Sequence, residues 1–238
     1  MPDPIRPDPI RIAVIDSGVH PDHPHIDAAR LLPGVAIAGD GAISECDTID
    51  ALGHGTAVTA AIQGQSSDAL CLPIQVFHNA LRTTARALVA AIDRAVAAEV
   101  DIINLSLGTV NPAHRDLFAA VADRALAAGV LIVAARETEG TPCYPGGLAQ
   151  VLGVSLDWDC PREDYAIRDG IVFASGHPRP IPGVPPRRNL HGVSFAVANM
   201  SGIVARGGRL AIARHLDQAT PNAATRSTIQ KQPIAPTA

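Results

Sequence analysis

The chain of 238 residues is 47% hydrophobic, which is enough apolar surface to bury a substantial core in one large domain without metal or disulfide support. Its formal net charge of −4 comes from interspersed charges with no sustained basic run, and this pattern argues against nucleic acid as a partner. No apolar stretch near the N-terminus has the length of a signal peptide or a membrane span, so we expect a cytoplasmic protein without membrane insertion.

Short β-branched runs alternate with longer alanine-rich stretches, which is typical of parallel strands joined by crossover helices. Strands are predicted at residues 11–17, 71–77, 101–107, 130–135, 151–156 and 171–175. They lack clean polar alternation, which favours strands covered on both faces. Amphipathic helices are predicted at 83–99 and 112–129, the second opened by Asn111 and Pro112 and closed by Gly129. The sequence thus predicts an α/β fold with a mostly parallel central sheet and helices on both faces.

The remaining segments indicate one domain with two polar ends. Residues 177–192 are rich in proline and glycine, which predicts a surface loop. From residue 218 the chain turns polar and proline-spaced, as disordered tails do. We therefore expect an N-terminal extension at 1–10, a single domain at 11–217 and a C-terminal tail at 218–238, without internal repeats.

Three segments carry polar residues at positions suited to chemistry. Asp16 ends an apolar strand and precedes a Ser17-Gly18 turn, so its carboxylate is expected at the carboxyl edge of the sheet. His54 lies between glycines at the start of an apolar helix, and Ser194 opens a helix of small residues, near backbone N–H groups. Taken singly, each signal is weak, and simpler explanations exist for Asp16 as a cap and for His54 as a structural donor.

Together, in the order Asp, His, Ser, these segments resemble the subtilisin-like serine peptidases, or subtilases, whose motifs read D-S/T-G, H-G-T and G-T-S-x-A. Asp16-Ser17-Gly18 and His54-Gly55-Thr56 match in full. Ser106-Leu107-Gly108 matches the substrate-binding strand of the family, and Tyr144-Pro145-Gly146 resembles one wall of the S1 pocket. The resemblance runs from about residue 11 to about residue 216 and implies a subtilisin-like three-layer fold over the predicted peptidase domain.

The resemblance implies a catalytic triad of Asp16, His54 and Ser194. A serine hydroxyl is barely nucleophilic at neutral pH, so a neutral imidazole must take its proton and later give it to the leaving amine. The carboxylate fixes the imidazole tautomer and stabilises the imidazolium, while the serine forms the acyl-enzyme. We expect three small residues to expose the nucleophile and let its helix pack closely on the sheet: Gly192, Ala196 and Gly202.

Several positions depart from the family pattern. Where subtilases place an oxyanion asparagine after a glycine, an ungapped alignment puts Thr138 after Glu137. Loss of such a donor costs about 2.7–4 kcal/mol, a figure measured on a subtilisin and hence on a relative of this chain. Val193 replaces the threonine before the nucleophile, and Ala198 and Asn199 replace a proline and a histidine. Thr138 is therefore a weak candidate oxyanion donor beside the backbone N–H of the nucleophile.

The resemblance also implies a set of substrate-binding residues around the P1 side chain. They are Ser106, Leu107, Gly108, Ala135, Arg136, Glu137, Cys143 and Tyr144. Glu137 suits a basic P1 residue, whereas Arg136 either neutralises Glu137 or selects an acidic one, and the alternative is that both face solvent. Cys143 is expected to narrow the pocket as a structural residue, because no base adjoins it in the sequence.

Three other features of the sequence concern metal sites and crosslinks. The histidines at 20, 23 and 25, with Asp22 and Asp27, resemble a metal cluster, but H-P-H-I takes the place of a family turn and the spacing matches no usual zinc pattern. The short segment after His54 predicts that the calcium loop of some subtilisins is missing, so we expect no metal and no cofactor. The cysteines form no C-x-x-C pair and are expected to be free thiols: Cys46, Cys71, Cys143 and Cys160.

The altered motifs favour a selective processing enzyme over a general scavenger. With only about ten residues before the first strand, the chain resembles small subtilases of bacterial peptide-modification systems. We expect an endopeptidase that cuts a peptide or protein substrate, such as a leader-bearing precursor. The alternatives are a catalytically silent peptide-binding protein and a transpeptidase or macrocyclase, in which an amine resolves the acyl-enzyme.

Overall fold

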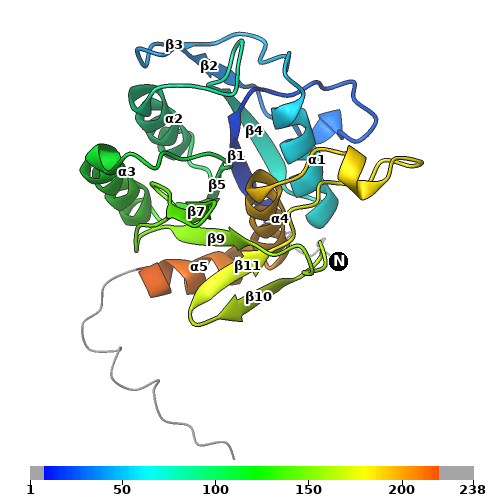
Figure 1. The fold of residues 1–238 in the computed structure, drawn as a ribbon. Coiled ribbons are helices and arrows are strands. Elements are labelled where there is room, and N and C mark those ends of the chain that lie inside the picture. The colour runs from blue at the N-terminus through cyan, green and yellow to red at the C-terminus, as the bar shows by residue number, and fades with distance from the viewer. Residues whose placement is uncertain (1–7, 220–238) are drawn as a thin grey trace, which may run out of the picture.

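A central β-sheet organises the protein in a computed structural model, which describes residues 8–219 (Figure 1). Within that range the main sheet has nine strands in the order β10-β11-β9-β6-β5-β1-β4-β2-β3. Its inner pairs are parallel, and only the edge pairs β10-β11 and β2-β3 are antiparallel. The strands of this sheet are β1 (Arg11–Asp16), β2 (Val35–Ile37), β3 (Ile43–Ser44), β4 (Leu70–Gln75), β5 (Ile102–Leu105), β6 (Leu131–Ala135), β9 (Leu152–Leu156), β10 (Tyr165–Arg168) and β11 (Ile171–Ala174).

Helices cover both faces of the sheet, as Figure 1 shows. The helices are α1 (His54–Gln65), α2 (Ala85–Ala97), α3 (Arg115–Ala127), α4 (Val193–Arg206) and α5 (Gly208–Ala219). One buried cluster packs β1 against α2 and α3 through Ala13 and Ile15, and the other packs it against α1 and α4 through Ile12 and Val14. Both faces of the strand are therefore buried, which explains its unbroken hydrophobic sequence.

The predicted α/β architecture is confirmed, and each of the six predicted strands overlaps an observed one. The predicted helix at 112–129 begins with a separate 3₁₀ turn, Pro112–His114, before α3. The sequence analysis missed β2, β3, β10, the small hairpin of β7 (Glu137–Thr138) and β8 (Thr141–Pro142), and α5. The missed strands are only two to four residues long, which is too short for a hydrophobic pattern to mark them.

The ends of the predicted domain map lie partly outside the described residues. Residues 1–7 of the predicted extension and 220–238 of the predicted tail are not described, whereas 218–219 form the end of α5. The predicted loop at 177–192 is irregular apart from one 3₁₀ turn, Pro186–Arg188. None of the described helices combines the length and the apolar character needed to span a membrane.

The carboxyl edge of the sheet gathers the chemically interesting segments. β1 and β5 are neighbours, with Ile15 beside Leu105, so Asp16 and Ser106 emerge at the same edge. α1 begins at His54, and α4 begins at Val193. Sites of α/β proteins form at this edge, and the fold brings the three candidate segments to it.

Candidate active site

The contact between Asp16 and His54 forms the centre of the site. Asp16 is fully buried, and its Oδ1 lies 2.8 Å from Nδ1 of His54. The backbone N–H of Ser17 donates to the same Oδ1 at 2.8 Å, and the Ser17 hydroxyl accepts the backbone N–H of Gly55 at 2.9 Å. A Cβ on Gly55 would lie 2.3 Å from the carbonyl oxygen of Gly18. The two motifs therefore hold the end of β1 against the first turn of α1, with no room for a side chain between them.

The environment of His54 favours its protonated form. Burial alone lowers the pKa of His54, but the hydrogen bond and charge of Asp16, together with the charge of Asp50, outweigh burial and raise that pKa above 6.5. When the ring is neutral, its Nδ1–H donates to the Asp16 carboxylate, which leaves Nε2 as the basic nitrogen. A base oriented in this way can take a proton through Nε2 and return it as an acid.

Asp50 is a part of this site that the sequence analysis missed. Its Oδ1 accepts the backbone N–H groups of Leu52 and Gly53 at 2.9 and 2.8 Å, and its Oδ2 accepts both the N–H and the hydroxyl of Thr56 at 2.8 and 2.7 Å. Burial raises the pKa of Asp50, but these hydrogen bonds outweigh it and lower that pKa. An aspartate shortly before a helix that begins with glycine and histidine is a signal that could have revealed this capping role.

Ser194 lies in the first turn of α4, after Gly192, whose φ of 137° lies outside the range of most side-chain-bearing residues. Its hydroxyl donates to the carbonyl oxygen of Ser106 at 3.1 Å, and the Ser106 hydroxyl donates back to the Ser194 carbonyl at 3.2 Å. Among the described residues, no hydrogen bond joins Ser194 to His54. The aromatic ring next to the serine, Phe195, has its centroid 5.9 Å from that of His54. The structure thus brings Asp16 and His54 into contact and places Ser194, in the first turn of α4, against Ser106 at the end of the adjacent strand β5.

A buried polar chain anchors the serine helix to the sheet. The Ser106 hydroxyl, besides donating to the Ser194 carbonyl, accepts the side-chain amide of Asn104 at 2.9 Å. The Asn104 side-chain oxygen in turn accepts the Ser201 hydroxyl at 3.0 Å. Ser106, predicted as a substrate-binding residue, therefore also positions the backbone of the nucleophile.

Thr138, the candidate oxyanion donor, lies exposed in the β7–β8 hairpin. Its Oγ1 is 3.2 Å from Sγ of Cys143, and either atom can be the donor. This hairpin occupies the part of the chain where the family asparagine was expected. The hydroxyl already has a partner, so its role toward an oxyanion stays a prediction.

The predicted substrate-binding residues lie in two segments of the chain. Residues 106–108 follow β5, and residues 135–144 run from the end of β6 to just beyond the β7–β8 hairpin. Thr109 and Tyr144 exchange backbone hydrogen bonds of 2.9 and 2.8 Å, and a Cβ on Gly108 would lie 2.9 Å from the Tyr144 carbonyl oxygen. Cys143 is buried beside this bridge, and Ala135 is buried at the end of β6. Glu137 accepts a hydrogen bond from the buried Ser155 hydroxyl at 3.2 Å. This bond turns one oxygen of the Glu137 carboxylate toward β9.

Asn199, the residue that replaces a family histidine, is the centre of a buried hydrogen-bond network. Its side-chain amide donates to the carbonyl oxygens of Ser175 and His177, both at 2.9 Å. Its side-chain oxygen accepts Gln65 at 3.2 Å and Arg162 at 3.4 Å. The residue is fully buried and ties α1 and α4 to the segment that leads into the 177–192 loop.

The histidine-rich turn and the cysteines form neither a metal site nor a crosslink in the described part of the chain. No three histidine, cysteine, aspartate or glutamate side chains there come together as metal ligands. The rings of His23 and His25 meet edge to face, with centroids 5.4 Å apart. The free thiols are Cys46, Cys71, Cys143 and Cys160. Burial raises the pKa of the Cys71 thiol to about 12, which makes it an inert core residue.

Sequence comparison places this geometry among known proteins. The profile of the Subtilase family matches residues 8–155, a stretch that includes Asp16 and His54. The minor extracellular protease Epr of Bacillus subtilis is 35% identical over 160 residues, which cover 61% of this chain and 23% of Epr. Subtilisin DY of Bacillus licheniformis is 26% identical over 159 residues, covering 63% and 53%. The subtilisin-like protease SBT6.1 of Arabidopsis thaliana is 28% identical over 158 residues, covering 61% and 14%. The chain thus matches about half or less of each relative.

The similar solved structures match a larger share of both chains than the sequence relatives do. The prenylagaramide maturation protease PagA is similar with a TM-score of 0.63 and 26% identity, covering 86% of this chain and 76% of PagA. A lanthipeptide protease is similar with a TM-score of 0.64 over 87% of this chain and 74% of its own. Its 20% identity supports a likeness of fold alone. The observed fold is therefore subtilisin-like over most of the chain.

Proposed function

Because the chain belongs to the subtilase family of serine peptidases, we propose that it is an endopeptidase that cuts a specific peptide or protein substrate through an acyl-enzyme on Ser194. The observation that carries the proposal is the 2.8 Å contact between buried Asp16 and His54 at the sheet edge where the serine also emerges. The raised pKa of His54 adds support, because Asp16 stabilises the imidazolium that forms during attack.

The proposed reaction begins with a rotation of the serine side chain. The Ser194 hydroxyl leaves the Ser106 carbonyl and donates to Nε2 of His54, which takes its proton as the oxygen attacks the scissile carbonyl. Catalytic hydrogen bonds often form only in the substrate complex, so the resting contact with Ser106 is compatible with this step. His54 then gives the proton to the leaving amine, and water resolves the acyl-enzyme by the same path.

The transition-state oxyanion has fewer obvious donors than in the family pattern. The backbone N–H of Ser194 lies in the first turn of α4, where the helix dipole favours negative charge. Thr138 is the proposed second donor, and it must turn away from Cys143 to act. A weak oxyanion site suits a selective enzyme, which can use binding energy from remote substrate contacts for alignment.

We propose peptide maturation as the biological setting, with a leader-bearing precursor as the substrate. The likeness to PagA, at 26% identity over 86% of the chain, supports this setting. The altered motifs and small size also resemble the leader-cleaving protease of quinohemoprotein amine dehydrogenase biogenesis. The four free thiols support a reducing compartment and hence cleavage in the cytoplasm.

A fluorophosphonate probe tests the enzyme proposal directly. We expect labelling of the wild-type chain, with the label mapped to Ser194 by mass spectrometry. The variants Ser194→Ala and His54→Ala should lose the label, whereas Ser67→Ala, which removes an exposed serine hydroxyl after α1, should keep it. Absence of labelling between pH 6 and 9 would overturn the proposed activity.

One observation favours the rival function of a silent peptide-binding protein. The Ser194 hydroxyl is bonded to Ser106, and the Thr138 hydroxyl contacts Cys143, so neither candidate group is free in the resting structure. If peptide binds but the probe does not react, the rival function holds. A transpeptidase is identified by product mass: addition of an amine to the acyl fragment in place of water.

A further inference from the structure

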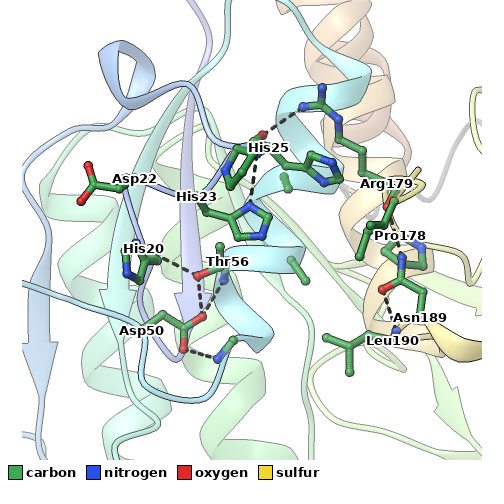
Figure 2. A pocket seen from close by; sticks show the side chains of 15 residues that line it. His20, Asp22, His23, His25, Asp50, Thr56, Pro178, Arg179, Asn189 and Leu190 are labelled. Atoms are coloured by element: carbon green, nitrogen blue, oxygen red, sulfur yellow. Dashed lines mark hydrogen bonds between the residues drawn. The ribbon is translucent and has the colours of Figure 1, made fainter. Parts of the chain in front are cut away.

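A cavity of 460 Å³ lies beside the N-terminus of α1, and the proposed reaction does not use it. Figure 2 shows its two walls. One wall is the histidine-rich turn, with His20, His23 and His25, together with the first turns of α1. The other wall comes from the 177–192 loop, with Arg179 and Leu190. Neither the histidine-rich turn nor the 177–192 loop supplies a group to the proposed reaction, so these parts of the cavity have no role in it.

The position of the cavity assigns it to one side of the scissile bond. Gly53 and Thr56, on either side of His54 in the sequence, line it, and Leu190 lies four residues before Ser194. A second cavity, of 230 Å³, lies along Leu107 and Gly108 among residues of α2 and α3, on the other face of the sheet. A peptide that crosses the nucleophile can thus reach one cavity on each side.

The direction of the peptide follows from the chemistry. The family resemblance assigns residues 106–108 to the acyl side of the substrate, and His54 must protonate the departing amine. The 460 Å³ cavity is lined by Gly53 and Thr56, which flank the base that protonates the departing amine, and by none of residues 106–108, so we place it on the leaving-group side.

The described lining of this cavity carries one permanent cation, Arg179, and two carboxylates, Asp22 and Asp50. The Nη1 of Arg179 donates to the His25 carbonyl oxygen at 2.9 Å. Burial, followed by the charge of Arg179 and then that of His23, lowers the pKa of His25. The guanidinium charge of Arg179 therefore acts on groups inside the cavity. The N–H groups of Arg179 that do not bind the His25 carbonyl can donate to a ligand.

Among the described residues, neither of the two lining carboxylates forms an ion pair with Arg179. The oxygens of Asp50 already accept four hydrogen bonds from residues at the start of α1. The side chain of Asp22 points away from the opposite wall, as Figure 2 shows. His23 adds a donor, because its Nδ1 accepts the His25 backbone N–H at 3.2 Å and the proton of the neutral ring is left on Nε2.

We propose that this cavity binds an acidic side chain, aspartate or glutamate, of the substrate on the leaving-group side, with Arg179 and the imidazoles of His23 and His25 as its partners. The inference rests on the proposed function, since it names a substrate feature of the same site. A carboxylate fits a guanidinium that offers paired N–H donors, and partial burial strengthens the contact relative to one in open solvent. The occupant is thus a peptide residue that leaves with the amine product.

Cleavage assays with matched peptides test the proposal. A peptide library first identifies a cleaved sequence, and internally quenched peptides then carry either glutamate or glutamine at each of the three positions after the cut. We expect kcat/KM to be about tenfold higher for glutamate at one position, as a charge-assisted contact gives. The variant Arg179→Gln should remove this preference, so that its kcat/KM values for the glutamate and glutamine peptides become equal. Arg82→Gln, which removes a cation from the other cavity, should keep the preference.

A binding assay keeps the inference testable if no peptide is cut. Fluorescence anisotropy measures the affinity of Ser194→Ala for labelled peptides with glutamate or glutamine, before and after the added substitution Arg179→Gln. Tighter binding of glutamate that depends on Arg179 supports the inference even where the proposed activity fails. Equal affinities, or a preference that survives Arg179→Gln, would overturn it whether or not the wild-type chain cleaves peptides.

Discussion

Replacement of Asp50 by alanine should destabilise the protein by about 2–4 kcal/mol. The side chain is only 7% exposed and accepts four hydrogen bonds from Leu52, Gly53 and Thr56. Loss of a helix cap costs about 0.5–2 kcal/mol, and each buried donor left without a partner adds about 1–3 kcal/mol where water cannot reach it. Water that enters the adjoining cavity can solvate most of the freed donors, so we count the cap and about one unpaired donor, which gives about 1.5–5 kcal/mol and centres the expected loss on about 2–4 kcal/mol.

Urea unfolding of Asp50→Ala measures this effect, in a Ser194→Ala background that prevents self-digestion. Asp93→Ala, which removes an aspartate from an exposed pair with Arg124, is the matched control and should cost less than about 1 kcal/mol. If Asp50→Ala proves no more destabilising than this control, the capping role assigned to Asp50 is wrong.

The pH dependence gives a second measure of the same residue. The pKa of Asp50 is lowered in the folded state, so its stabilisation is fully present well above its ordinary pKa of 3.8 and is lost as the pH falls through the lowered value. The stability gap between wild type and Asp50→Asn should therefore narrow below about pH 4. Since the Asp50 charge also raises the pKa of His54, the acidic limb of kcat/KM should move to lower pH in Asp50→Asn. An unmoved limb would contradict the electrostatic link between the two residues.

Three further substitutions have defined outcomes. Asn199→Ala should lower the free energy of unfolding by about 2–4 kcal/mol in urea titration, because it leaves the carbonyls of Ser175 and His177 without donors; a loss below 1 kcal/mol would refute the network. Gly55→Ala should abolish probe labelling of Ser194 even where circular dichroism shows a folded protein, because the new Cβ collides with the Gly18 carbonyl. Thr138→Val should lower kcat by about tenfold with little change in KM if its hydroxyl reaches the oxyanion, which is less than the loss of the family asparagine costs because the threonine hydroxyl has a shorter reach; unchanged kcat would assign that hydroxyl to Cys143 alone.

The core of the fold was predictable because strong local signals and packing agree. β1 buries Ile12 and Val14 on one face and Ala13 and Ile15 on the other, so its continuous hydrophobic run indicated a doubly covered strand. The edge strands gave no such signal: β3 has two exposed residues, and β10 exposes Tyr165 and Ile167. Their pairing depends on neighbours distant in sequence, which periodicity does not encode.

The candidate site, like the fold, has parts that the sequence predicts and parts that it does not. The D-S-G and H-G-T motifs predicted residues whose contacts are local to β1 and α1, and Asp16 and His54 meet as expected. Asp50 was missed because an isolated aspartate in a loop has many possible roles, and its four hydrogen bonds appear only once α1 is placed. Gly202 was expected to bring α4 close to the sheet, but a Cβ there would meet Gln65 at 2.6 Å and the Ile62 carbonyl oxygen at 2.8 Å. It therefore permits a contact between two helices.

The contact at Gly202 has an evolutionary consequence. His54 is the first residue of α1 and Ser194 is near the start of α4, so the helix pair that meets at Gly202 carries both the base and the nucleophile. Descendants of this chain therefore keep glycine at 202, because a Cβ there meets both the Cβ of residue 65 and the backbone carbonyl of Ile62, and truncation of residue 65 to glycine relieves only the first contact. A lineage that gains a side chain at 202 has to move α1 away from α4, which separates its base from its nucleophile.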